Sequence, residues 1–347
     1  MSARAKFTLP ILLLAIVHLP TIVPGLLAPY PFAAQHRDYP YAPPARIHFT
    51  DDSGGLRLWP VVYSVNPDLS GGYQEDRSRE YPLSLSQQPG VFLLGTDGYG
   101  RDVLSRLLYG GQISLLTGLL AAFLSLALGA GAGVVSGYFG GWPDRLLMRG
   151  GELVMALPWL YLLLGVRTLL PLHISTLQAF LLLIAIIGGV GWVRPARLIR
   201  AVALSGRERG FVQAARGFGA SHLYVIRRHV LPFTAGVALA QATVLIPQYV
   251  LAEVTLSFLG LGIGEPTPSW GNMLAEARQY HSLVSHPWLL APGLAMIPVL
   301  LGYFLLADAL LERSETRLGS REYRGTLPLR RTGQAIGDHP DPRSYPL

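Results

Sequence analysis

The chain has no cysteine and only one lysine, Lys6, among its 347 residues. The lack of cysteine excludes disulfides, thiolate zinc sites and cysteine nucleophiles. A P-loop needs a lysine directly after its glycines to reach the nucleotide phosphates, and no such glycines precede Lys6. The chain therefore has no P-loop, and any ATP hydrolysis that serves it must take place in a partner.

Charged residues are also scarce. They make up 14% of the chain, against about 25% in an ordinary soluble domain, whereas apolar residues make up 50%. The net charge is +7, a sign that a nucleic-acid-binding protein could share. The arginines lie between apolar segments rather than along one soluble face, so we expect contact with membrane lipid and no nucleic acid.

No pattern of catalytic or metal-binding residues is present. The histidines are scattered, without the His-x-x-x-His spacing that would place two imidazoles on one helix face. The serines have no His and Asp at a recognisable spacing. We therefore predict that the chain is not an enzyme and binds neither metal nor cofactor itself.

Six apolar segments approach the length of about 20 residues that a membrane-spanning helix needs. They cover approximately residues 7–28, 113–138, 151–170, 177–193, 232–258 and 287–311. The sequence thus predicts an all-α membrane protein with six transmembrane helices. The first segment could instead be a secretory signal peptide, but its long apolar run and the lack of a convincing cleavage site favour an uncleaved anchor.

The segment 30–90 differs in composition from its surroundings, because it is rich in Pro, Tyr, Asp and Arg. We predict an extracytoplasmic insert between the first two helices, either a small β-rich subdomain or an ordered excursion. The arginine-rich ends of the other segments place both termini in the cytoplasm by the positive-inside rule. The predicted parts are a stub with the first helix (1–29), the insert (30–90), a core with the second to sixth helices (91–315) and a cytoplasmic tail (316–347).

The basic loop 194–231 carries a local pattern of helix, break and helix. Gly219 can adopt the left-handed conformation that ends a helix, and Ser221 can cap the next one. Pro232 then opens the fifth span at a tolerated position. Composition alone fits equally well with an ordinary basic loop that binds anionic lipid headgroups.

The spacing within this loop resembles the EAA loop of ABC importer permeases. That motif is Glu-Ala-Ala, three residues, Gly, nine residues and a short apolar element ending in Leu-Pro. Here the same separations hold for Gln-Ala-Ala-x-x-x-Gly at 213–219 and His-x-Leu-Pro at 229–232. Gln in place of Glu is a departure that the peptide-type branch tolerates. The resemblance implies a coupling helix that docks into an ATPase subunit through Gln213, Ala214, Ala215, Gly219 and Ser221.

Three further segments resemble the second permease subunit, the C-type, of the dipeptide, oligopeptide and nickel importers. They are 94–106, which contains Gly-Thr-Asp-x-x-Gly-Arg-Asp, and the segments 253–271 and 287–293. In the first, Asp97, Arg101 and Asp102 offer an ion-pair and capping cluster, which we interpret as structural.

Polar residues in the fifth span are candidates for the translocation path, namely Gln241, Gln248 and Glu253. A polar or ionisable side chain within a span usually faces the protein interior or a water-filled path. Interhelical hydrogen bonds explain Gln241 and Gln248 equally well. For Glu253, near the outer end, we favour a structural partner.

The resemblance implies a type I ABC importer permease in the bacterial inner membrane, for peptides or similar small solutes. The implied partners are a homologous permease subunit that forms a heterodimer with this chain, two cytoplasmic ATPases that hold ATP and Mg, and an extracytoplasmic solute-binding protein. The alternative is a secondary transporter or channel that works without ATP. Such a protein would show internal repeats or an ion site in mid-membrane, and the sequence has neither.

Overall fold

The computed structural model describes residues 3–325, apart from 51–55, 69–71, 86, 89 and 170–173. The chain divides into two units, residues 1–309 and residues 310–347. The second unit contains the end of the last helix, and most of the predicted tail 316–347 lies outside the described residues.

Helices form most of the described chain. Before the central region they are α1 (Ala3–Ile22), α2 (Pro24–Leu27) and α3 (Val103–Phe139). They continue with α4 (Gly141–Ala156), α5 (Trp159–Thr168), α6 (Thr176–Gly191), α7 (Val193–Arg207), α8 (Gly210–Gly217) and α9 (His222–Val225). After a π-helical turn η1 (Ile226–Val230) come α10 (Leu231–Phe258), α11 (Trp270–Glu276), α12 (Tyr280–Ser285), a 3₁₀ turn η2 (Pro287–Leu290) and α13 (Ala291–Gly325).

By length and composition, three helical stretches can cross a membrane: α3, the continuous run His222–Phe258, and Pro287–Glu312. Two bent pairs raise the number to five in the described chain, if α4 with α5 and α6 with α7 each make one span. The first predicted span corresponds to a shorter apolar helix, Lys6–Ile22. The chain is thus a helical membrane protein, and six spans remain a prediction.

The third predicted span is broken rather than straight. The structure bends by 91° between α4 and α5, where Leu157 is extended and Pro158 precedes the new helix. A proline disfavours helical backbone in the residue before it, so the break follows from the local sequence. The second predicted span begins at residue 113, about ten residues after the observed start of its helix. Asp102 caps α3, which begins at Val103.

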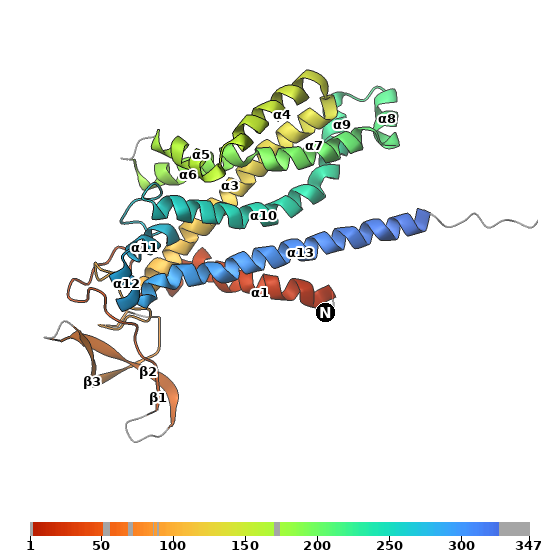
Figure 1. Cartoon of the computed structure of the whole chain (residues 1–347). Helices are drawn as coiled ribbons and strands as arrows, with labels where there is room; N and C mark the ends of the chain where they lie inside the picture. The colour runs from red at the N-terminus through yellow and green to blue at the C-terminus, as the bar shows by residue number, and fades with distance from the viewer. Residues whose placement is uncertain are drawn as a thin grey trace, which may run out of the picture. The chain divides into compact units, whose positions relative to one another are not determined.

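Helix α3 is the packing centre of the first unit and lies against α6, α7 and α10 (Figure 1). Glycines allow this close approach. A Cβ added at Gly133 would lie 2.6 Å from the carbonyl oxygen of Ala196 on α7, and one at Gly137 would lie 2.6 Å from that of Arg200. A Cβ added at Gly131 of the same helix would have nothing within 4 Å.

The insert contains a three-stranded antiparallel sheet, in the order β1 (His48–Thr50), β2 (Leu56–Pro67) and β3 (Tyr73–Pro82). Val61 pairs with Pro82 and Val65 with Glu75, and the register shifts between Tyr63 and Ser64. Of the two sequence alternatives, the described residues therefore support the β-rich subdomain, and the prediction of an all-α chain does not extend to this insert.

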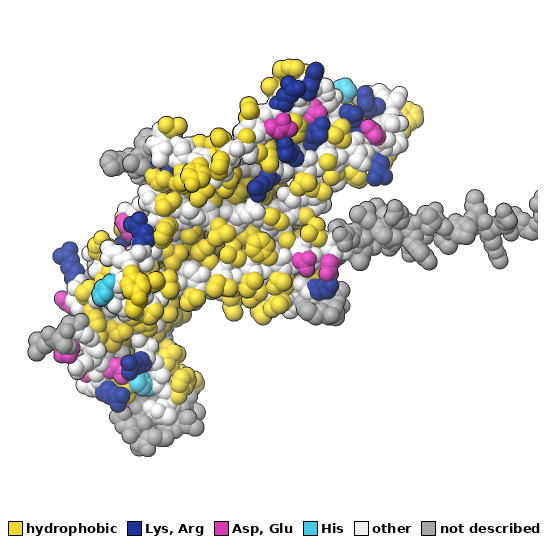
Figure 2. All heavy atoms as spheres, viewed as in Figure 1, with side chains coloured by type: hydrophobic (Ala, Val, Ile, Leu, Met, Phe, Trp, Pro, Cys, Tyr) yellow, Lys and Arg dark blue, Asp and Glu magenta, His cyan; other side chains and the backbone are white. Residues whose placement is uncertain are grey.

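The two ends of the first unit differ in character. Figure 1 shows the sheet at one end and the α8–α9 connection at the other. Figure 2 shows hydrophobic side chains gathered over the middle, while arginine side chains gather over α4, α7 and the α8–α9 end. This distribution is that of a membrane protein with a lipid-facing band between two polar ends.

Candidate functional site

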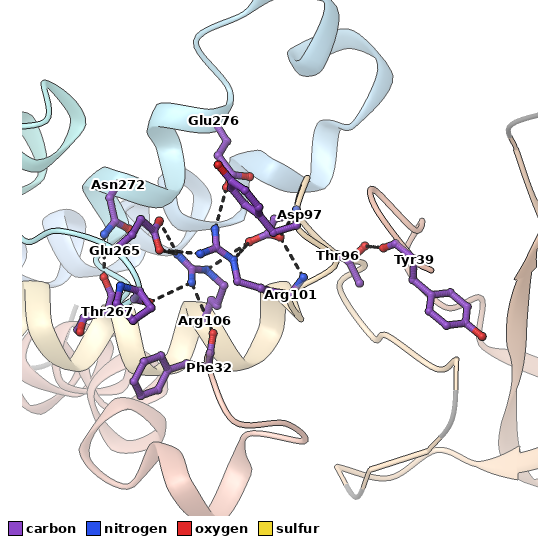
Figure 3. Close-up of polar contacts among 12 residues, drawn as sticks. Phe32, Tyr39, Thr96, Asp97, Arg101, Arg106, Glu265, Thr267, Asn272 and Glu276 are labelled. Carbon is purple, nitrogen blue, oxygen red and sulfur yellow. Dashed lines mark hydrogen bonds and ion pairs between the residues drawn. The ribbon is translucent and has the colours of Figure 1, made fainter. Parts of the chain in front are cut away.

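A buried ionic cluster joins the start of α3 to the segment between α10 and α12. Arg101 donates from Nε to Asp97 at 2.6 Å, from Nη1 to Glu265 at 2.6 Å and from Nη2 to Glu276 at 3.1 Å. Arg106 donates from Nη2 to Glu265 at 3.0 Å. Figure 3 shows the two guanidinium groups lying between the three carboxylates. Both arginine side chains are almost completely buried.

Local turns prepare this arrangement. Asp97 accepts hydrogen bonds from the backbone amides of Tyr99 and Arg101, both at 2.9 Å. Gly100 has φ of 71°, and a Cβ there would lie 2.0 Å from the carbonyl oxygen of His36, so this close turn requires glycine. The motif Gly-Thr-Asp-x-x-Gly-Arg-Asp thus builds a tight turn that presents Asp97 and Arg101 to the cluster.

The third motif residue, Asp102, has a different partner. Its carboxylate accepts hydrogen bonds from the amide and the hydroxyl of Ser105, at 2.7 and 2.6 Å, and caps α3. Burial raises the pKa of Asp102 to about 6, although the bonds from Ser105 oppose the rise. The structure therefore contains both the predicted ion pair and the predicted cap, each in its own place.

Sequence reasoning missed Arg106, Glu265 and Glu276 as members of the cluster. Arg106 and Glu265 are 159 positions apart, so no local pattern joins them. The available signal was a charged residue at the end of the motif segment 94–106, shortly before the second predicted span, and another in a Gly- and Pro-rich loop. Burial and the neighbouring Asp97 raise the pKa of Glu276 to about 7. Removal of one member of such a cluster leaves a buried charge without its partner.

A cavity of about 490 Å³ lies where three helical elements break or carry proline. The α4–α5 bend, the α6–α7 bend and α10 around Pro247 surround it. The rings of Trp159 and Tyr249 stack at 5.8 Å with an angle of 16° between their planes. The Tyr249 hydroxyl lies 2.9 Å from Ser125 Oγ of α3. In a membrane, irregular backbone is tolerated where it is buried in protein or lines a cavity.

The three polar candidates of the fifth span separate in space. Gln248 lines the cavity. Gln241 is half-buried on α10 and is not among the lining residues. Glu253 is completely buried and accepts a hydrogen bond from Ser257 Oγ of the same helix at 2.6 Å, and it is not among the residues of the cavity wall. Trp159, Tyr249 and Arg194 also line the cavity, and sequence reasoning did not select them.

The segment predicted to dock forms a hydrogen-bonded turn at the α8–α9 end. Gly219 has φ of 82°, as predicted for a helix-ending glycine. The amide of Ala220 donates to the carbonyl of Ala215 at 3.0 Å, and Ser221 Oγ accepts from the amide of Tyr224 at 3.3 Å. The predicted break and cap are therefore both present, and the connection between α8 and α9 has a defined shape.

A hydrophobic base supports this turn. Val212, Val225 and Val230 are completely buried, and they pack with Val134 and Tyr138 of α3. Ala215 is half-buried against the same cluster. The remaining predicted docking residues are exposed: Gln213, Ala214, Gly219 and Ser221. Thus Ala215 packs on the buried side of the turn, whereas the other four residues lie on its exposed surface.

Large apolar side chains lie uncovered around the turn. Phe218 is 92% exposed, and Phe211, Leu223 and Tyr224 are each more than half exposed. Sequence reasoning concentrated on the small residues and missed these four. The available signal was a large apolar residue in or beside each short helix. The buried face of these helices is already formed by other residues. An exposed apolar group of this kind marks an interaction surface.

Residues 129–319 match the sequence model of the family described as binding-protein-dependent transport system inner membrane component. The chain belongs to this family. The matched region contains the cavity and the α8–α9 turn. It also contains Glu265 and Glu276, whereas the ionic cluster residues of the first motif precede it. The permease is accordingly a component of a membrane transport system, as the motif resemblance implied.

Relatives named as peptide permeases are similar to this permease over most of their length. A "Putative peptide transport system permease protein" of Brucella suis is 40% identical over 234 residues, which are 67% of this chain and 76% of the relative. The "Oligopeptide transport system permease protein OppC" of Haemophilus influenzae is 36% identical over 251 residues, which are 72% of this chain and 78% of the relative.

Proposed function

We propose that the permease is one transmembrane subunit of an ATP-driven importer of peptides or similar small solutes. The names of its relatives support the solute class. The observation that carries the proposal is the α8–α9 turn, where exposed apolar side chains lie over a buried hydrophobic base. Since the chain has no P-loop, the ATPase that this surface would contact is a separate subunit.

The structure provides a mechanical path from the turn to the cavity. Helix α9 continues through η1 into α10 as one run from His222 to Phe258. The same run carries Gln248 and Tyr249 on the cavity wall. Helix α7 packs along α3 and reaches the cavity at its first turn. A force applied to α8 and α9 would therefore move two of the elements that shape the cavity.

The other assignments follow from this role. The α8–α9 turn and both termini face the cytoplasm, and exposed arginines around the turn agree with the positive-inside rule: Arg216, Arg227 and Arg228. The sheet faces the opposite side, where it can contact a solute-binding protein. A homologous permease completes the pathway, and two ATPases holding ATP and Mg complete the importer in the bacterial inner membrane.

Phe218→Asp tests the docking surface. Phe218 is 92% exposed, so the change should leave folding intact while placing a charge in the ATPase contact. We expect loss of co-purification with the ATPase and loss of solute-stimulated ATP hydrolysis in proteoliposomes. Tyr280→Asp is the matched control, because Tyr280 is 81% exposed on α12, at the other end of the unit. Uptake that continues without any ATPase would instead support the ATP-independent transporter.

A further inference from the structure

Arg194 differs from the other arginines of α7. Arg197 pairs with Glu152 at 3.3 Å, Arg200 pairs with Asp144 at 2.5 Å, and Arg207 lies 3.8 Å from Glu208. Arg194 lines the cavity instead, and within the part of the chain that the structure describes it has no ion pair. It is also the one charged residue among the described residues of the cavity wall.

Several residues of the cavity wall are exposed, and Arg194 is among them. A Cβ at Gly191, three residues before Arg194, would collide with the Tyr249 hydroxyl, which itself contacts Ser125. Ser125 is about 20 Å along the axis of α3 from the end of that helix at Phe139, at 1.5 Å per residue. Arg194 begins one helical turn from the contact of Tyr249 with Ser125, and its side chain is exposed on the cavity wall, where a solute can reach it.

The groups around Arg194 suit a small solute with a carboxylate. The guanidinium group presents parallel donors that match the two oxygens of a carboxylate. The stacked rings of Trp159 and Tyr249 offer an apolar wall, and Gln248 offers an amide. The volume of about 490 Å³ falls within the range of about 300–1,000 Å³ typical of ligand pockets.

We propose that Arg194 binds the free carboxylate of the solute during passage, so that the permease prefers a peptide with a free C-terminus to its C-terminal amide. This proposal rests on the proposed function, because it takes a peptide as the solute. The carboxylate supplies the opposite charge that Arg194 lacks, and the ring pair and Gln248 contact the remainder of the solute. Arg194 is thus a specificity-determining residue of the pathway.

The test uses the whole importer in proteoliposomes, with a peptide and its C-terminal amide each supplied at a concentration that saturates the solute-binding protein. Under this condition the rates report steps after capture. Arg194→Gln should lower the uptake rate of the free peptide about tenfold or more, since a hydrogen bond to a charged group contributes about 1.5–3 kcal/mol. Uptake of the amide should change little. Arg197→Gln, at a paired and exposed site off the cavity wall, should change neither rate.

Three results would overturn the proposal: equal rates for the two peptides in the unmodified importer, no effect of Arg194→Gln, or an equal fall in both rates. The last would show that Arg194 contacts lipid phosphate or an acidic residue of another subunit. Should the importer with Arg194→Gln fail to assemble, Arg194→Lys is the second variant, because it keeps the charge but removes the parallel donors of the guanidinium group. It should lower the uptake rate of the free peptide, and not that of the amide, by a smaller factor. Failure of the unmodified importer to transport any peptide would refute the proposed function itself.

Discussion

The packing of α7 on α3 leads to a sharp prediction about two glycines of one helix. A Cβ at Gly133 would approach the Ala196 carbonyl oxygen to 2.6 Å and the Arg200 amide nitrogen to 3.0 Å, whereas Gly131 has nothing within 4 Å. Both contacts of Gly133 are with backbone atoms, which cannot rotate away. Gly133→Ala must therefore displace α7 from α3, and Gly131→Ala leaves the interface unchanged.

The magnitude follows from the cost of overpacking. Inserting one carbon into a closely packed interior costs about 1–3 kcal/mol. Alanine also favours a helix over glycine by about 1 kcal/mol, but this gain applies to both variants and largely cancels in their difference. We therefore expect Gly133→Ala to be less stable than Gly131→Ala by about 1–3 kcal/mol, which is roughly a five- to 150-fold change in the unfolding equilibrium.

The assay is unfolding of the two purified variants in detergent, side by side, by heat and by denaturant. A lower midpoint for Gly133→Ala with an unchanged or raised midpoint for Gly131→Ala is the expected result. Equal midpoints would refute the reasoning, because they would show that α7 does not approach α3 as closely as the structure has it. The same reasoning gives Gly133→Ala a lower uptake rate, since α7 borders the cavity.

Three further predictions concern the ionic cluster and the turn. Arg101→Gln should lower the free energy of unfolding by about 3 kcal/mol, which is near the lower end of the range for a broken buried ion pair because Glu265 is half exposed. The control is Arg278→Gln, because Arg278 is exposed. Equal unfolding midpoints for the two variants would contradict the prediction. The unfolded chain releases the Glu276 proton near pH 4.5, whereas the folded chain retains it to about pH 7. The free energy of unfolding of the unmodified protein, compared with that of Glu276→Gln, should therefore fall as the pH rises from about 4.5 to about 7. A pH-independent difference would show that Glu276 is ionised throughout. Ser221→Ala should cost about 1 kcal/mol by removing the cap of α9, visible as faster hydrogen exchange at the Tyr224 amide, and unchanged exchange would argue against the cap.

The sequence determined those features that depend on neighbours along the chain. Apolar runs predicted most of the helices, and Gly219 and Ser221 predicted the turn between α8 and α9, because a left-handed glycine and a capping hydroxyl act within a few residues. The motif at 95–102 likewise predicted a turn with an ion pair and a cap. The spacing of the small residues also led to the correct family, although it did not reveal the exposed Phe218 beside them.

The tertiary structure decided which distant residues share a site. Arg106 and Glu265 meet only because α3 and the segment after α10 pack together, and no local rule could pair residues so far apart. The cavity likewise depends on two helix bends and a third helix that surround one space. This packing separates Gln248, on the cavity wall, from Glu253, which is buried elsewhere, although both lie on α10. The direction in which a helix face points is set by its neighbours in three dimensions, and that direction decided which polar residue borders the cavity.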